Sequence, residues 1–207
     1  MKTAHVPIRA PRQLSEQREQ ELLAAAREIF FARGVTLATM DEIAARAGVS
    51  KTTIYRRYKS KEEMFKAIII GTTREMASRL EGLTLDAEHP AQSLRAAAEL
   101  IRKTLLAPEY LALMRQMLLE AERLPELSRQ ARDLMTEALT RPFVRFFTTL
   151  IAAGRMQHDY PEQAAITFVM MSSAGYRPLL NAMGSDRTER RRMKADIEMF
   201  LRGGAIT

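Results

Sequence analysis

Residues 50–58 carry a dense set of hydrogen-bond donors on a segment short enough to be one helix. Ile54 and Tyr58 are one helical turn apart, so they share a face and leave the polar side chains near or on the outer surface. These side chains are Lys51, Thr52, Thr53, Tyr55, Arg56 and Arg57. Donors of this kind suit phosphate oxygens and the O6/N7 edge of guanine. An ordinary solvated helical surface has a similar composition, so this pattern alone leaves both interpretations open.

A second short helix is predicted directly before this segment. Thr39 and Glu42 form a capping-box pattern that begins a helix over residues 39–47. Gly48 then supplies a turn residue that tolerates a positive φ, and the small side chain of Ala44 lets the two helices cross closely. The pair has the dimensions of a helix-turn-helix. A solvated helical hairpin is the alternative.

The positive charge of the chain is concentrated near its N-terminus. The first 66 residues hold 13 of the 32 basic residues but only 8 of the 25 acidic ones, which places +5 of the net +7 there. A small basic domain joined to a nearly neutral larger one favours a polyanion as the partner of the first part. Solubility alone would also account for the excess.

Apolar residues recur at helical spacing along almost the whole chain, and no convincing strand alternation occurs. The first helix is predicted from Ser15 to Gly34, a natural stop. Ser60 and Glu63 form another capping box, which begins a long helix towards Leu80. The apolar face of the first helix consists of Leu22, Ala26, Ile29 and Phe30.

Four prolines stand where later helices are expected to begin, because a missing N–H costs little in the first turn; they are Pro90, Pro108, Pro125 and Pro161. A long helix is predicted over residues 126–153, where Pro142 must kink or restart it. A helix over residues 161–173 is apolar on most of its surface and is expected to be buried. The last helix, over residues 186–203, has an apolar face made by Met193, Ile197, Phe200 and Leu201.

The segment that contains the two short helices resembles a known protein family. Residues 22–66, from LLAAAREIFFARGV through MDEIAARAGVSKTTIYRRYKSKEEMF, closely resemble the DNA-binding domain of tetracycline-repressor (TetR) family regulators. The resemblance implies an all-α fold with a basic arm (1–14), a three-helix helix-turn-helix DNA-binding domain (15–60) and a C-terminal helical bundle (61–207) for ligand binding and dimerisation. The chain departs from the family pattern at Ala38, where members commonly have a second hydroxyl residue, so one phosphate contact is in question.

The resemblance also implies roles for single residues. Lys51, Thr52 and Arg56 would face base edges in the major groove, and Thr53, Tyr55 and Arg57 would hold phosphates or lie at the groove margin. Thr39 and Lys61 would grip the DNA backbone at helix starts, where free N–H groups attract phosphate. Ser50 completes the expected DNA-binding set.

The function implied is that of a transcriptional regulator without enzymatic activity. A homodimer, joined through the last two helices and including the apolar face of the final one, would bind a pseudo-palindromic double-stranded operator. A small apolar or amphipathic effector would release it. Repression is the first expectation, and an activator with the same DNA-binding domain is the alternative. A helical ligand-binding bundle without specific DNA binding is a rival of a different class.

The larger C-terminal region is rich in methionine, which suits an adaptable apolar cavity. Tyr110 and Arg115 are candidate polar partners for a ligand. The apolar candidates are Met114, Met117, Phe143, Phe147 and Met170, and plain core packing is the alternative for each of them.

Several other sites and locations are excluded or disfavoured. The absence of cysteine excludes disulfides and thiolate metal sites, and the three histidines, His5, His89 and His158, lie too far apart for metal-ligand spacing. No phosphate-binding glycine loop or nucleophile elbow occurs, so neither a cofactor nor catalysis is expected. The uncharged stretch at 163–176 is shorter than the ~20 residues that span a membrane. Without a signal-peptide pattern, a cytoplasmic location is expected.

Two further basic segments have a polyanion as an alternative partner. Arg9 and Arg12 in the N-terminal arm would suit a minor groove, but a terminus without function is equally simple. The final helix begins with a second basic cluster, for which a solvated helix surface is expected rather than a second polyanion site. The cluster consists of Arg190, Arg191, Arg192 and Lys194.

Overall fold

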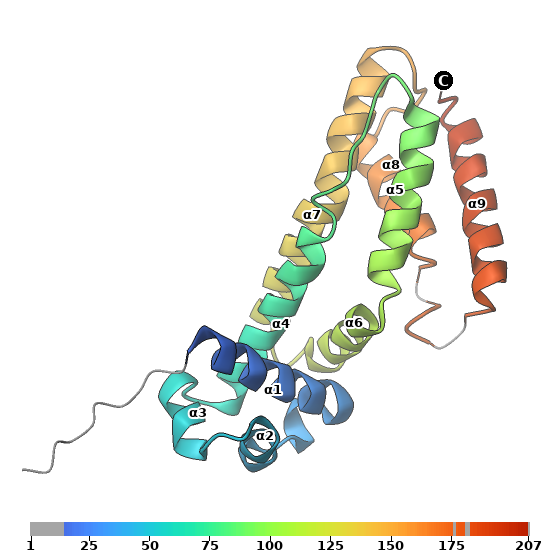
Figure 1. Cartoon of the computed structure of the whole chain (residues 1–207). Coiled ribbons are helices and arrows are strands. Elements are labelled where there is room, and N and C mark those ends of the chain that lie inside the picture. Colours follow the sequence, from blue (N-terminus) through green and yellow to red (C-terminus); the bar gives the residue numbers. More distant parts are fainter. Residues whose placement is uncertain (1–14, 176, 181–182, 207) are drawn as a thin grey trace, which may run out of the picture. The chain divides into compact units, whose positions relative to one another are not determined.

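The computed structural model describes residues 15–175, 177–180 and 183–206, and this part of the chain contains helices but no strand (Figure 1). The expected basic arm, with Arg9 and Arg12, lies outside the described residues. The helices are α1 (Glu16–Leu37), α2 (Met40–Ala47), α3 (Lys51–Arg57), α4 (Lys61–Ser78), α5 (Pro90–Leu105), α6 (Pro108–Glu120), α7 (Pro125–Ala152), α8 (Pro161–Ser172) and α9 (Asp186–Gly203).

The chain divides into two compact units, Met1–Ile68 and Ile69–Thr207. Helix α4 begins in the first unit and ends in the second. The sequence places its domain boundary at residue 60, before α4, because a capping box marks a helix start but gives no sign of where packing changes along the helix.

The first unit is held by a small core shared by α1, α2, α3 and the start of α4. Leu22, Phe30, Ile43, Ile54 and Phe65 are all fully buried. The rings of Phe30 and Phe65 meet edge to face with their centroids 5.4 Å apart, an arrangement that aromatic pairs favour. This core fixes the two short helices α2 and α3 on the longer helix α1.

The predicted stop at Gly34 is present as a local break in α1 rather than as its end. Gly34 has φ 76° and ψ 163°, and the helix continues to Leu37 beyond it. The N–H of Ala38 donates to the carbonyl of Gly34 at 3.2 Å. A residue with a side chain would be strained at this φ.

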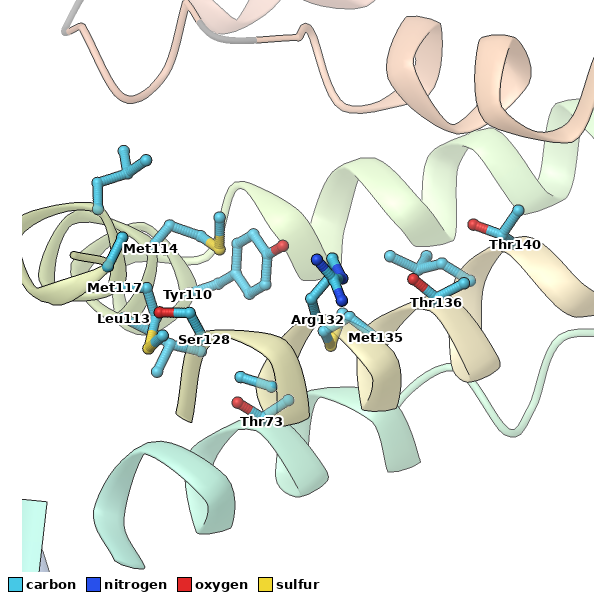
Figure 2. A pocket seen from close by; sticks show the side chains of 14 residues that line it. Thr73, Tyr110, Leu113, Met114, Met117, Ser128, Arg132, Met135, Thr136 and Thr140 are labelled. Carbon is cyan, nitrogen blue, oxygen red and sulfur yellow. The ribbon is translucent and has the colours of Figure 1, made fainter. Parts of the chain in front are cut away.

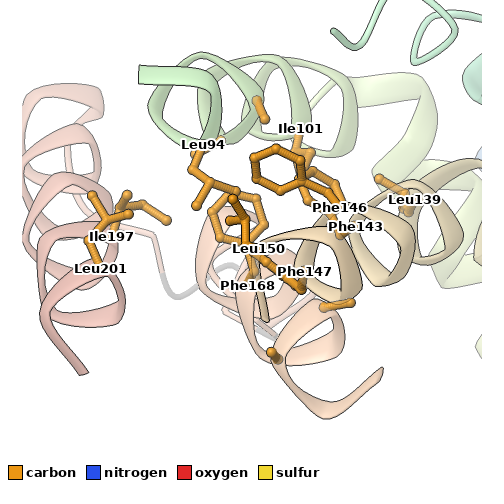
Figure 3. Close-up of a cluster of buried hydrophobic side chains, with 14 of the residues drawn as sticks. Leu94, Ile101, Leu139, Phe143, Phe146, Phe147, Leu150, Phe168, Ile197 and Leu201 are labelled. Atoms are coloured by element: carbon orange, nitrogen blue, oxygen red, sulfur yellow. The ribbon is translucent and has the colours of Figure 1, made fainter. Parts of the chain in front are cut away.

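The second unit has its core between α5, α7, α8 and α9 (Figure 3). Three phenylalanines lie at its centre, and the Phe143 and Phe168 ring centroids are 4.7 Å apart. Phe143, Phe147 and Phe168 are fully buried. The predicted proline starts are confirmed, since α5, α6, α7 and α8 each begin at one.

Helix α7 runs through Pro142 without restarting. Pro142 lacks the N–H that would donate to the preceding turn, but Leu139 and Phe143 on either side of it are buried in the core. Packing therefore holds the helix across the missing hydrogen bond. Two apolar residues of α7, Leu134 and Ala138, are only half-buried.

The buried faces of α8 and α9 differ from those expected from the sequence. Ile166 and Met170 of α8 are 47% and 38% exposed, so this helix is buried on one face only. Ile197 and Leu201 of α9 are buried against α5 and α8, as is Met193 (Figure 3). The expectation that this face of α9 meets a second copy is therefore wrong, because its own chain covers it. None of the described helices combines the length and the apolarity that crossing a bilayer demands.

Candidate nucleic-acid interface and internal cavity

Short-range hydrogen bonds fix the start of α2 and the turn between α2 and α3. The Thr39 hydroxyl accepts from the Glu42 N–H at 3.2 Å, and the Glu42 carboxylate accepts from the Thr39 N–H at 3.0 Å. At the other end of α2, Gly48 has the left-handed conformation, φ 63° and ψ 35°. The N–H of Val49 then donates to the Ala44 carbonyl at 3.1 Å. The predicted capping box and glycine turn are both confirmed.

Helix α3 is anchored by its apolar side and exposed on its polar side. Ser50 caps its start by accepting from the Thr53 N–H at 3.1 Å. Ile54 is fully buried and Tyr58, just after the helix, is 6% exposed. The polar residues identified from the sequence therefore share an outer surface, which we call the α3 surface; its exposed members are Lys51, Thr52, Tyr55, Arg56 and Arg57, and Thr53 is half-buried.

Two cations of the α3 surface have carboxylate partners on other helices. The Lys51 Nζ donates to Asp41 Oδ2 at 3.0 Å, and this hydrogen bond raises the pKa of Lys51. The Arg57 Nε donates to Glu19 Oε1 at 2.8 Å, which likewise raises the pKa of Arg57. Sequence reasoning missed both acids. Glu19 is 38 positions from Arg57, so no local pattern links them.

Thr39 and Lys61, the expected backbone contacts, both lie near the end of α1, and Lys61 is bonded to its last residues. The Lys61 Nζ donates to the carbonyls of Thr36 and Ala38 at 3.0 and 2.9 Å. Lys61 thus holds the chain next to the start of α2, where Thr39 is exposed. Hydrogen bonds from the Thr39 side chain and backbone lower the pKa of Glu42, and the Arg33 guanidinium adds to this effect.

The second unit contains a mostly apolar cavity of about 320 Å³ (Figure 2). Burial raises the pKa of Tyr110 to about 12, so its hydroxyl stays neutral and able to donate. The Ser128 Oγ is buried without a hydrogen-bond partner in the described structure. The cavity is lined by Thr73 of α4, by Tyr110, Leu113, Met114, Met117 and Leu118 of α6, by Ala121, and by Ser128, Ala131, Arg132, Met135, Thr136, Leu139 and Thr140 of α7.

Three of the seven ligand candidates from the sequence line this cavity: Tyr110, Met114 and Met117. The other four lie elsewhere. The Arg115 Nη2 donates to the Pro178 carbonyl at 3.3 Å, and Met170 is on the outer face of α8. Phe143 and Phe147 are in the aromatic core.

Sequence reasoning missed the contribution of α7 to the cavity. A usable signal was present, because hydroxyl and apolar side chains recur along α7 at helical spacing. The missed α7 residues include Ser128, Met135, Thr136 and Thr140.

The second basic cluster is partly neutralised by ion pairs. Arg190 donates to Asp186 at 2.9 Å and to Glu99 at 3.0 Å, and Arg192 pairs with the buried Glu189 at 3.2 Å. The ion pairs of Arg190 and Arg192 thus serve to join helix turns and neighbouring helices.

Comparisons with known proteins agree with this geometry. Residues 22–68 match the family model of bacterial regulatory proteins of the tetR family. Residues 92–203 match the model of the AefR-like transcriptional repressor C-terminal domain. The chain belongs to the TetR family. It is accordingly a DNA-binding transcriptional regulator rather than an enzyme.

Two curated transcriptional regulators match less than half of this chain. The transcriptional activator FasR of Mycolicibacterium smegmatis is 40% identical over 84 residues, which cover 41% of this chain and 38% of FasR. The regulator SrpR of Pseudomonas putida is 38% identical over 72 residues, which cover 35% of this chain and 30% of SrpR. The matched segments thus span well under two thirds of either relative.

Solved TetR-family structures match nearly the whole chain. A transcriptional regulator from Mesorhizobium loti has a TM-score of 0.77 and 25% identity, with 90% of this chain and 96% of that chain covered. The flavonoid-responsive regulator FrrA has a TM-score of 0.72 and 26% identity, with 91% and 97% covered. Both the DNA-binding unit and the larger helical unit therefore have counterparts in the family.

Proposed function

We propose that this TetR-family protein is a ligand-responsive repressor that binds a pseudo-palindromic operator as a homodimer and leaves it when a small apolar or amphipathic effector binds. The α3 surface is the observation that carries the DNA-binding part. Lys51, Thr52 and Arg56 face base edges, and Arg56 is the strongest candidate for a guanine because its planar fork bonds bidentately. The residues that hold phosphates are Thr39, Thr53, Tyr55, Arg57 and Lys61, and Ser50, which caps α3, completes the DNA-binding set.

Repression is favoured by the match of the larger unit to a domain described as AefR-like transcriptional repressor. Activation is the second candidate, because FasR carries the name of an activator. A reporter gene under the protein's own target promoter separates the two. Deleting the regulator raises expression if it represses and lowers expression if it activates.

A dimer supplies the specificity that one short helix lacks. Two copies of α3 about 34–36 Å apart read successive major grooves of a two-fold symmetric site. The exposed apolar residues of α8 and α9, Ile166, Met170 and Met199, are candidates for the dimer interface. A second copy would bury them symmetrically.

The cavity of the second unit is the proposed effector site. Its lining is apolar apart from a few hydroxyls and Arg132, which suits an amphipathic molecule with a polar end. Tyr110 and Ser128 would bond that polar group. The flavonoid-responsive name of FrrA is consistent with an aromatic effector carrying hydroxyl groups. A ~100-fold preference for the DNA-free state would supply about 2.7 kcal/mol of coupling.

Ser128→Leu tests the effector site because it fills the cavity without removing a hydrogen bond. We expect this variant to bind DNA like the wild type but to resist release by compounds that dissociate the wild-type complex. Gln130→Leu is the matched control, since Gln130 is exposed on the same turn of α7 and outside the cavity lining. Equal release of both variants in a fluorescence anisotropy titration would place the effector elsewhere.

A further inference from the structure

One carboxylate of the first unit joins the start of α1 to the end of the recognition helix α3. The Glu19 Oε1 accepts from the Arg57 Nε at 2.8 Å and from the Tyr58 hydroxyl at 3.1 Å. Arg57 is the last residue of α3 and Tyr58 follows it directly, whereas Glu19 lies in the first turns of α1. A single oxygen thus ties together two helices that are far apart in the sequence.

Tyr58, Glu19 and Arg57 differ in burial. The more buried residues can therefore hold the more exposed one in place. Tyr58 is 6% exposed, and its burial raises its pKa to about 12, so its hydroxyl remains a donor. The side chain of Glu19 is 26% exposed and that of Arg57 is 61% exposed. The buried tyrosine therefore fixes the carboxylate, and the fixed carboxylate holds the outer arginine.

The contact uses the part of Arg57 that is least suited to reach DNA. Because Nε is engaged, the two terminal amino groups remain as the donors of the planar guanidinium. The Arg57 guanidinium carbon also lies 5.9 Å from the centre of the Tyr58 ring, within the range of a cation–π contact. Both contacts reduce the freedom of a long side chain before any phosphate arrives, which lowers the entropy lost on binding.

We propose that Glu19 is a positioning residue that orients Arg57 for a phosphate of the operator. The inference rests on the proposed function, in which Arg57 holds a phosphate. An acid near DNA repels phosphate in general. Glu19 instead favours binding by holding Arg57 in the orientation that a phosphate contact needs. Residues that support a binding side chain commonly act in this way.

A double-mutant cycle tests the proposal, with affinity for a fluorescent operator duplex measured by anisotropy at fixed salt. We expect Glu19→Ala to weaken binding about three- to tenfold, as the loss of one hydrogen bond would. In an Arg57→Ala background, Glu19→Ala should change the affinity little. An equal loss in both backgrounds would show that Glu19 only supports the fold, and no loss in either would also overturn the proposal.

Glu19→Gln keeps the experiment decisive if the alanine variant folds poorly. Its amide oxygen still accepts from Arg57 and Tyr58, so we expect an affinity within about twofold of Glu28→Gln. Glu28 is the matched control, because it lies on the same helix, pairs with Arg46 and carries the same charge. A much tighter complex of Glu19→Gln than of Glu28→Gln would mean that Glu19 competes with phosphate, which contradicts positioning.

The failure of this inference is distinguishable from that of the proposed function. If Arg57→Ala binds operator like the wild type, Arg57 holds no phosphate, and both the role of Arg57 and the inference fall. If Arg57→Ala binds weakly while Glu19→Ala binds normally, only the positioning role of Glu19 fails.

Discussion

Single side chains on α3 differ in how they are held. Lys51 and Arg57 are paired with carboxylates from α2 and α1, and Arg56 stands between them in sequence on the exposed side of the helix. Exposed ion pairs contribute only about 0–1 kcal/mol to stability. Their larger effect here is on where the cations lie before DNA arrives.

Arg56→Ala should lower operator affinity by about 1–3 kcal/mol and relax the preference at one base pair, because a bidentate guanine contact is lost. Competition binding against operators substituted at each position measures both effects. Lys61→Ala serves as the comparison, and it should weaken binding to all sequences and flatten the salt dependence. An equal loss on operator and random DNA would assign Arg56 to phosphate instead.

The capping box of α2 predicts a pH dependence of stability. The folded-state pKa of Glu42 is lowered by hydrogen bonds from Thr39. Its contribution to stability is therefore present above the ordinary glutamate pKa of about 4.3 and is lost as the pH falls through the lowered value. The melting temperature of wild type should exceed that of Glu42→Gln at neutral pH, and the difference should shrink in acid. Glu21→Gln, at an exposed position of α1, controls for charge. A difference that stays constant with pH would contradict this account.

At the scale of helices, α8 separates a structural face from an outer face. Phe168 is fully buried against Phe143 and Phe147 on the inner side, and Ile166 and Met170 are exposed on the other. One helix therefore helps to hold the second unit together and carries exposed apolar residues on its other side. The two roles can be separated by mutation because they use different residues.

Phe168→Ala should destabilise the second unit by about 3–5 kcal/mol, since it removes a large side chain from a packed aromatic cluster. Chemical denaturation followed by circular dichroism measures the change. Ile166→Ala, which removes an exposed side chain of the same helix, should leave the unfolding of the single chain nearly unchanged. Similar losses for both variants at low protein concentration would show that the two faces of α8 are not distinct.

Local patterns predicted the elements of this fold well, for a physical reason. A capping box such as Thr39–Glu42 and a left-handed glycine such as Gly48 are decided by residues a few positions apart. The helix-turn-helix could thus be placed closely from the sequence. Pro142 shows the limit of such rules, because burial of its neighbours lies outside the local pattern.

Contacts between residues far apart in the sequence could not be predicted from local patterns. The apolar face of α9 is real, but periodicity does not tell whether the same chain or a second copy covers Ile197 and Leu201. Likewise, the methionines of α6 were identifiable as candidates, whereas the α7 wall with Ser128 depends on how two helices pack. The Glu19–Arg57 contact has the same origin.

In the proposed function, two copies of the chain bind one operator. A two-fold symmetric dimer presents the same surface from each copy, so one substitution changes the interface twice. The exposed residues of α8 and α9 are the proposed contact, and the residues proposed to contact DNA belong to the other compact unit. Dimerisation and DNA contact can therefore be altered independently.

Ile166→Glu should convert the protein to monomers, because it buries a charge twice at the proposed two-fold interface. Analytical ultracentrifugation gives the oligomeric state, and anisotropy should show a large loss of operator affinity with less change on random DNA. Gln130→Glu, at an exposed position of α7, controls for charge. A dimer that survives Ile166→Glu would place the interface on another surface.

The most direct test of the central claim is selection of binding sites from a pool of random duplexes by the purified protein, followed by sequencing. We expect enrichment of one motif with two-fold symmetric halves, and Arg56→Ala should lose the preference at one position in each half. Recovery of unenriched sequences by the wild type at modest ionic strength would contradict the claim that the α3 surface recognises DNA.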